Sequence, residues 1–149
     1  MLLGSLDSRK EPSLKIFIAI TLMMFSLTSL AAEIEYIPPA KRTELKNDFE
    51  KSKPITSVEG SWVCEMFGVR SGLQVAHDVK LFNFKKTGET FVNSGAHFVS
   101  KFEVKDGELF GGARNMTEII RRQADGSLIS RLTPEGSKEA TVYSVCRQS

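Results

Sequence analysis

The sequence lacks most of the motifs by which enzymes are identified. It contains no His-Glu-x-x-His, no phosphate-binding glycine loop, no nucleophile elbow and no Cys-x-x-Cys. Only two histidines occur, His77 and His97, and Asp78 would face the opposite side of a strand from His77. The histidines therefore have no neighbour in sequence that would complete a metal site. We predict a protein that is not an enzyme and that holds neither a metal nor another cofactor.

Long runs of one charge are also missing, which bears on the class of partner. The chain has 20 Lys and Arg and 18 Asp and Glu, of which three and two, respectively, precede residue 32. The rest of the chain therefore carries 17 basic and 16 acidic side chains, a net charge of +1. No basic run in that part exceeds two residues. A nucleic-acid-binding surface needs a dense basic patch, so we expect no nucleic-acid partner.

Residues 1–31 have the layout of a secretory signal peptide. Basic residues at positions 9, 10 and 15 lead into an apolar run over 16–30, and small residues surround a cleavage site after Ala31 or Ala32. A membrane-spanning helix needs about 20 apolar residues, and this run is shorter and is interrupted by Thr21, Ser26 and Thr28. We predict a periplasmic or secreted protein with no stable membrane span after cleavage. The alternative is a retained membrane anchor.

The chain has two cysteines, Cys64 and Cys146, and both follow the predicted signal. Two cysteines in an exported chain usually pair, because the compartment is oxidising. The bridge would close a loop of about 80 residues, which the chain-entropy account values at roughly 4 kcal/mol. We predict this disulfide; the alternative is two buried free thiols.

Residues 32–57 differ in composition from the domain at 58–149. Within the segment, Pro38-Pro39 precedes a charged stretch at 40–51, which places Leu45 and Phe49 four residues apart, on one face of a helix. Proline is favourable in the first helical turn, and Pro54 would stop the helix. We predict a short N-terminal helix or a linker.

From residue 58 the hydrophobic period is two, which is typical of strands. Turn residues recur about every ten positions, and Asp-Gly between apolar stretches favours a hairpin. The predicted turns are at 70–72, 86–88, 94–95, 106–107, 111–112, 125–126 and 134–136. The predicted strands are 60–68, 73–84, 89–93, 96–105, 108–113, 116–123, 127–133 and 139–147.

Eight short antiparallel strands predict an all-β fold, either a barrel or a sandwich. Cys64 lies in the first predicted strand and Cys146 in the last. The first and last strands of an up-and-down barrel are neighbours, so a bridge between them favours the barrel. We predict an eight-stranded antiparallel barrel or flattened barrel with a short N-terminal helix, and the sandwich stays the alternative.

The start of the first strand, Gly60-Ser61-Trp62, resembles the Gly-x-Trp motif of the lipocalin superfamily. That resemblance implies a lipocalin-like barrel in which Trp62 plugs the closed end. The wider pattern is similar to small exported bacterial barrels that open with Gly-x-Trp-x-Cys and close with Cys-Arg, here Cys146-Arg147. A carrier of a small apolar ligand is one function that the resemblance implies.

A second resemblance is to periplasmic inhibitors of lysozyme, whose inhibitory loop begins Ser-Gly-x-x-Tyr. The matching residues are Ser94-Gly95-Ala96-His97-Phe98, although the Trp-Trp-Thr-Lys-Gly element of those inhibitors is missing. This resemblance implies binding to a protein partner in the cell envelope, as an inhibitor or immunity protein does. Its candidate residues are Ser94, Gly95, His97 and Lys101.

Arginine is concentrated in the later strands of the domain. Alternate arginines on neighbouring strands could form a patch for an acidic partner, and the simpler interpretation is a solvated strand face. The residues concerned are Arg114, Arg121, Arg122 and Arg131. We predict a non-enzymatic binding protein, with a protein partner favoured over a small apolar ligand.

Overall fold

We analysed a computed structural model, which describes residues 36–70, 74–95 and 99–149. They belong to one compact unit, Ile34–Ser149. The unit has one helix, α2 (Pro39–Lys51), and its first two strands are short, β1 (Tyr36–Ile37) and β2 (Lys53–Pro54). The remaining strands are β3 (Gly60–Arg70), β4 (Gln74–Thr87), β5 (Thr90–Asn93), β6 (Lys101–Lys105), β7 (Glu108–Ala113), β8 (Met116–Arg122), β9 (Leu128–Pro134) and β10 (Val142–Gln148).

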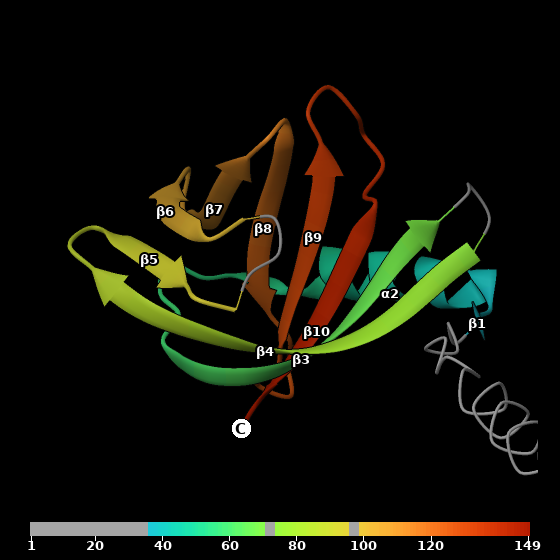
Figure 1. Ribbon diagram of the computed structural model, residues 1–149, viewed down its shortest axis with the longest axis horizontal. Helices are drawn as coiled ribbons and strands as arrows, with labels where there is room; N and C mark the ends of the chain where they lie inside the picture. The colour runs from blue at the N-terminus through green and yellow to red at the C-terminus, as the bar shows by residue number, and fades with distance from the viewer. Residues whose placement is uncertain (1–35, 71–73, 96–98) are drawn as a thin grey trace, which may run out of the picture. The chain divides into compact units, whose positions relative to one another are not determined.

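Strands β3 to β10 form a closed antiparallel barrel (Figure 1). Each pairs with the next along the chain, and β10 returns to pair with β3, which closes the ring. The two short strands add to it from outside the ring, β1 on β4 and β2 on β8. The prediction of an eight-stranded barrel with a short helix is confirmed, and the closed ring excludes the sandwich.

Successive side chains of β3 point alternately into the barrel and away from it. Trp62, Cys64 and Met66 belong to the interior core, whereas Val63 is 43% exposed on the outer wall. Phe67 has the outward parity of Val63 and yet is buried. It belongs to a second cluster, in which α2 contributes Leu45 and Phe49.

Five of the thirteen buried residues of the interior core are aromatic. Phe84 lies edge-on to its neighbours, with ring centres 6.1 Å from Phe82 and 5.9 Å from Phe102. Trp62 stands near the start of β3, opposite Gln148 at the end of β10, and donates from Nε1 to the carbonyl of Glu59 at 3.0 Å. The buried members of this core are Val58, Trp62, Cys64, Phe82, Phe84, Phe91, Val99, Phe102, Leu109, Ile120, Leu128, Leu132 and Cys146.

The predicted disulfide is present. Cys64 and Cys146 are direct cross-strand partners on β3 and β10, with Cα atoms 4.0 Å apart. Both are buried, so the bridge lies in the interior core and ties the first strand of the barrel to the last. A buried disulfide is consistent with a periplasmic or extracellular protein.

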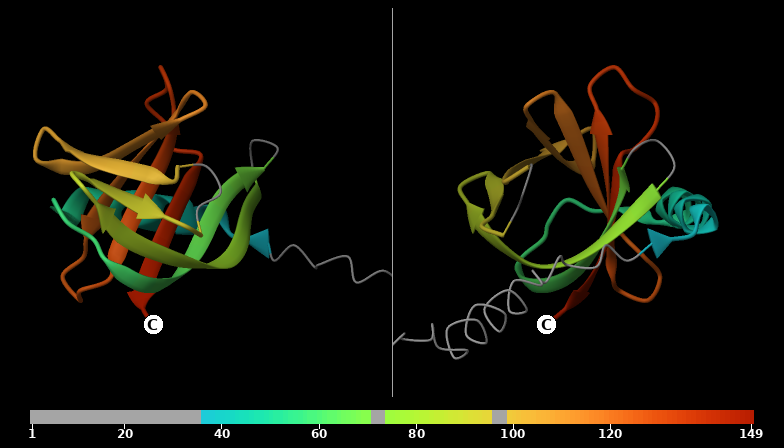
Figure 2. Two further views of the ribbon diagram at one scale, coloured as in Figure 1. Left: turned by 60° about the vertical axis from the view of Figure 1, so that its left-hand side comes forward. Right: turned by 45° about the vertical axis from the view of Figure 1, so that its right-hand side comes forward.

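Helix α2 lies against the outside of the barrel, across β9 and β10 (Figure 2). Its charged sequence supplies only two buried side chains, Leu45 and Phe49, and the four-residue spacing places both on the barrel side. Pro39 stands in the first turn, and the helix ends at Lys51, where Ser52 Oγ donates to the carbonyl of Phe49 at 2.5 Å. The predicted short helix is therefore confirmed.

One predicted turn is wrong. Gly111 and Gly112 lie inside β7, and the hairpin turn falls at Arg114-Asn115, where both residues have positive φ, 51° and 62°. Gly111 is needed for packing instead. A Cβ on Gly111 would lie 2.3 Å from Val99 Cγ1 and 2.8 Å from the carbonyl oxygen of Lys101.

This crowding gives a prediction with an adjacent control. We expect Gly111→Ala to lower the free energy of unfolding by about 1–3 kcal/mol, because overpacking forces neighbouring atoms apart. At Gly112 the nearest atom to an added Cβ is 3.8 Å away, an ordinary contact, so Gly112→Ala should change stability by less than about 0.5 kcal/mol. Urea denaturation of both variants measures the difference; equal effects would contradict the account.

Candidate functional site

The arginines that the sequence singled out divide by the contacts they make. The guanidinium groups of Arg121 and Arg131 both lie 4.6 Å from the ring centre of Phe49, so they stack on the helix residue most deeply buried. Arg121 also forms an ion pair with Glu108 at 2.5 Å, and Arg131 forms one with Glu50 at 3.3 Å. These two arginines hold α2 on the barrel.

The other two arginines lie near ends of the strands. Arg122 stands 5.8 Å from the ring centre of Trp62 and donates to the carbonyl of Gly126 at 3.1 Å. Arg114 is exposed in the β7–β8 turn. The four arginines therefore form no single continuous patch, and Arg131 lines a groove.

The residues of the Ser94-Gly95 resemblance lie beside β4. Ser94 donates its backbone N–H to the carbonyl of Asn83 at 3.1 Å, and Gly95 donates to Asn93 Oδ1 at 3.1 Å. A Cβ on Gly95 would lie 1.9 Å from the carbonyl oxygen of Leu81, so only glycine fits there. Lys101 begins β6 and is exposed, and His97 lies outside the described residues.

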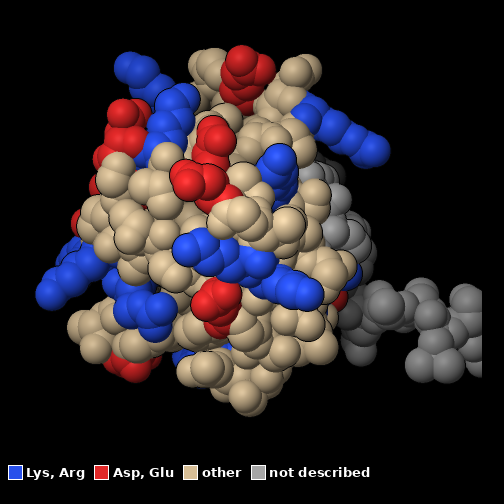
Figure 3. All heavy atoms as spheres, turned by 90° about the vertical axis from the view of Figure 1, so that its left-hand side faces the viewer, with Lys and Arg blue, Asp and Glu red and all other residues tan. Residues whose placement is uncertain are grey.

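Lys101 also lines a groove of about 300 Å³ on the outside of β5, β6 and β7. Glu103 lines the same groove, and Lys105 stands 4.8 Å from the ring centre of Phe110 nearby. Figure 3 shows this side of the molecule, where Lys and Arg are interspersed with Asp and Glu. This face therefore does not select for a partner of one charge.

A second groove, of about 370 Å³, lies on the outside of β8 and β9. We call it the β8–β9 groove. Its lining contains two cations, a group of hydroxyls and one apolar side chain, and no carboxylate. These residues are Thr117 and Ile119 from β8, Arg131 and Thr133 from β9, and Ser137 and Lys138 from the β9–β10 loop.

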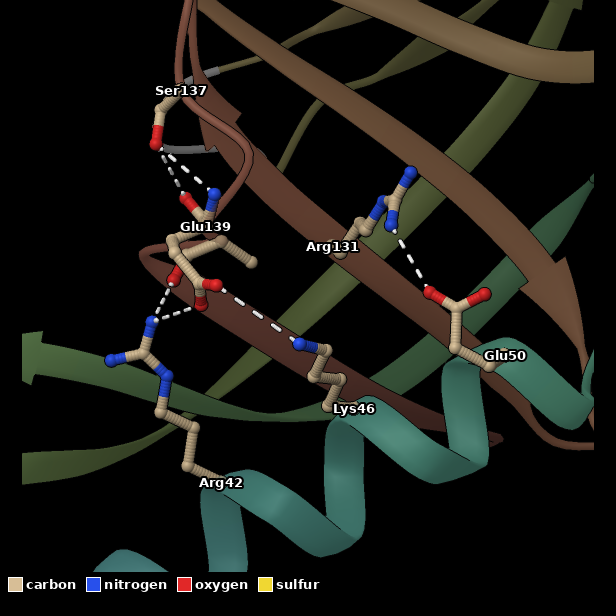
Figure 4. Close-up of polar contacts among 7 residues, drawn as sticks. Arg42, Lys46, Glu50, Arg131, Ser137 and Glu139 are labelled. Carbon is tan, nitrogen blue, oxygen red and sulfur yellow. Dashed lines mark hydrogen bonds and ion pairs between the residues drawn. The ribbon is translucent and has the colours of Figure 1, made fainter.

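Helix α2 and the β9–β10 loop are joined by polar contacts beside this groove (Figure 4). Arg42 and Lys46 reach the carboxylate of Glu139 at 3.5 and 4.0 Å, and Arg42 also donates to the carbonyl of Ala140 at 2.7 Å. Within the loop, Ser137 Oγ accepts from the backbone N–H of Glu139 at 3.1 Å. The loop is thereby held in one conformation at the rim of the groove.

The charges around the β8–β9 groove do not cancel. Four cations, Arg42, Lys46, Arg131 and Lys138, stand against three carboxylates, Glu50, Glu135 and Glu139. The excess is one positive charge, and Glu50 and Glu139 are already engaged by Arg131, Arg42 and Lys46. The groove is therefore suited to an anionic group.

Inside the barrel, a polar cluster interrupts the apolar core. Glu118 is 8% exposed, and its Oε1 accepts a hydrogen bond from Ser130 Oγ at 2.7 Å. Burial raises the pKa of Glu118 from 4.5 to about 7, and the Ser130 hydrogen bond offsets part of that rise. Ser144, the cross-strand partner of Ser130, is also buried. The interior thus holds a carboxyl group that is half protonated near neutral pH.

Sequence reasoning identified Arg131 and missed the other groove residues and Glu118. The predicted turn at 134–136 marked the β9–β10 loop as exposed, and this was the available signal for Ser137 and Lys138. The sequence contains no signal that Glu118 points into the barrel, because the next two residues, Ile119 and Ile120, are both apolar and face opposite sides of the wall. The sequence of β8 was therefore compatible with either set of alternate side chains facing the interior.

Among the described residues, no cluster of three or more His, Cys, Asp or Glu side chains could hold a metal ion. In the same part of the chain, no helix is long and apolar enough to cross a membrane. The fold and grooves thus define a disulfide-linked eight-stranded barrel with a basic groove on its outer wall. No protein-family model matches the chain, and the searches of curated proteins and of solved structures give no match.

Proposed function

We propose that this chain is an exported, non-enzymatic binding protein of the cell envelope that recognises a protein partner, in the manner of an inhibitor or immunity protein. The observation that carries the proposal is the basic β8–β9 groove, which has Arg131 on one wall and Lys138 on the loop. The apolar run at 16–30 and the Cys64–Cys146 disulfide support a periplasmic or secreted location.

The scaffold favours binding through its outer wall. The disulfide, the closed sheet and the stacked Phe49 hold the groove before a partner arrives. A site that is ordered in advance loses less conformational entropy on binding.

Affinity capture tests this function. We expect the protein purified from the periplasm to retain a discrete envelope protein in stoichiometric amount, with retention reduced at high salt because exposed charge contacts are screened. The same capture with Lys138→Glu should retain less of that protein. Recovery of bound lipid alone, with no protein, would contradict the proposal.

A second candidate, a lipocalin-like carrier of a small ligand, is favoured by one observation. Ligand pockets are mainly apolar and contain a few inward polar groups, and Glu118, Ser130 and Ser144 are such groups inside this barrel. Native mass spectrometry of the protein purified without organic solvent distinguishes the two functions. The carrier predicts an added small-molecule mass that organic extraction removes; the protein binder predicts no such small-molecule mass.

A further inference from the structure

We infer that the β8–β9 groove binds an acidic peptide segment, whose carboxylates are held by Arg131 and Lys138. This inference rests on the proposed function and specifies the chemistry of the partner. The groove differs from a general basic patch because its two cations come from separate walls, the strand β9 and the β9–β10 loop. A single acidic stretch of the partner can therefore contact both.

Arg131 is prepared for this role by its surroundings. Its guanidinium carbon lies 4.6 Å from the ring centre of Phe49, and only Nη1 is hydrogen-bonded within the described chain, to Glu50 Oε1 at 3.3 Å. A guanidinium group has five N–H donors in a planar fork that fits carboxylates. Glu50 shows that a carboxylate is accepted there, and the remaining donors are left for a second one.

Lys138 supplies a charge that the fold does not use. Within the described ranges it takes part in no ion pair or side-chain hydrogen bond, and it is exposed beside Ser137. The nearest acid in sequence, Glu139, is held by Arg42 and Lys46. Among the described residues no acid is paired with Lys138, so an incoming carboxylate displaces no existing ion pair there.

The rest of the lining fits a peptide. Thr133 and Ser137 present hydroxyls, which can donate to or accept from a peptide backbone. Ile119 stands opposite Arg131 on the neighbouring strand and is half-buried, so its exposed part offers an apolar surface to a side chain of the partner. The 370 Å³ volume stands near the lower end of ligand sites, so it suits a short segment and not a large rigid ligand.

Nuclear magnetic resonance titration of the isotope-labelled, folded protein tests the inference. The probes are acetylated hexapeptides that alternate Asp or Glu with Leu, and matched peptides with Asn and Gln in place of the acids. We expect chemical-shift changes at residues 117–119, 131–133 and 137–138 with the acidic peptides and none with the amide peptides. A polyanionic saccharide, polygalacturonate, is the third probe.

Two charge-reversal variants provide the contrast. Lys138→Glu lies in the groove, and Lys85→Glu makes the same change on exposed β4, outside the groove lining. We expect Lys138→Glu to weaken acidic-peptide binding at least about tenfold, since each 1.4 kcal/mol of lost contact energy is tenfold, and Lys85→Glu to change it less than about twofold. Both variants should retain the circular dichroism of the parent.

The outcomes separate the two proposals. Shifts elsewhere on the barrel, equal shifts with the amide peptides, binding of the saccharide without the peptides, or equal weakening by both variants would overturn the inference. If a partner protein is captured equally by the parent and by Lys138→Glu, the protein-binding function stands and the acidic-peptide inference fails. If no protein is captured by the parent, the proposed function itself fails.

Discussion

Removal of the Cys64–Cys146 disulfide is expected to lower the free energy of unfolding by about 4 kcal/mol. The bridge joins residues 82 apart in sequence, and closing a loop of that length removes conformational entropy from the unfolded chain. A loss of this size is a large part of the stability of an ordinary domain. The Cys64→Ala/Cys146→Ala double variant, in urea denaturation, measures the effect.

Two controls accompany the disulfide prediction. Adding a thiol reductant to the parent should reproduce the loss, and adding it to the double variant should change nothing. Denatured, unreduced parent protein should contain no titratable thiol. Two titratable thiols, or a double variant as stable as the parent, would show that the bridge does not tie β3 to β10 in the protein.

Replacing Glu118 by Gln is expected to stabilise the protein in a pH-dependent manner. Below pH 4.5 the folded and unfolded chains both hold the proton, so the carboxyl contributes no pH dependence. Between pH 4.5 and about 7 the unfolded chain releases the proton while the folded chain keeps it, so stability falls as the pH rises. Above about pH 7 both chains have released the proton, and the loss of folding stability caused by the buried, ionised carboxylate is constant, on the order of 3 kcal/mol.

The Gln side chain keeps an oxygen that can accept from Ser130 and cannot ionise. We therefore expect Glu118→Gln to match the parent near pH 4 and to exceed it by about 3 kcal/mol near pH 8. Urea denaturation across this range measures the difference, and Glu103→Gln, which removes an exposed carboxyl, is the control. A constant difference at all pH values would contradict the buried position of Glu118.

The barrel could be predicted from the sequence because the early strands obey simple rules. In β3, alternate residues point into the core, and the predicted turn Asp106-Gly107 has the positive φ values, 52° and 78°, that a tight hairpin requires. The two cysteines then identified which strands close the ring. The strand alternation and the turn residues are local features of the chain, and the closure of the ring depends on one covalent bond, so all three can be read from the sequence.

The covered part of the wall could not be predicted in the same way. Ile129 and Tyr143 face outward and yet are buried, because α2 covers them, and Ile119 packs part of its side chain against the same cluster. Apolar residues on both faces remove the alternation that would reveal which side chains point inward. Glu118 was therefore missed, although the strand that contains it was predicted to within one residue.

The arginine contacts were invisible for a different reason. Arg121 and Phe49 are 72 positions apart, and their contact exists only because α2 packs across the strands. A spacing of basic residues along a strand cannot distinguish an arginine that holds a helix from one that faces a partner. The groove depends on the same packing, together with a loop whose conformation is fixed by Arg42 and Glu139.

Site-specific photo-crosslinking in the cell envelope tests the central claim most directly. A photoreactive residue placed at Thr133, inside the β8–β9 groove, should yield one discrete protein adduct, and the same residue at Lys85 should yield none. The Thr133 adduct should diminish when Lys138→Glu is introduced. An adduct at Lys85 and none at Thr133, or adducts with lipid alone, would contradict a protein partner bound at this groove.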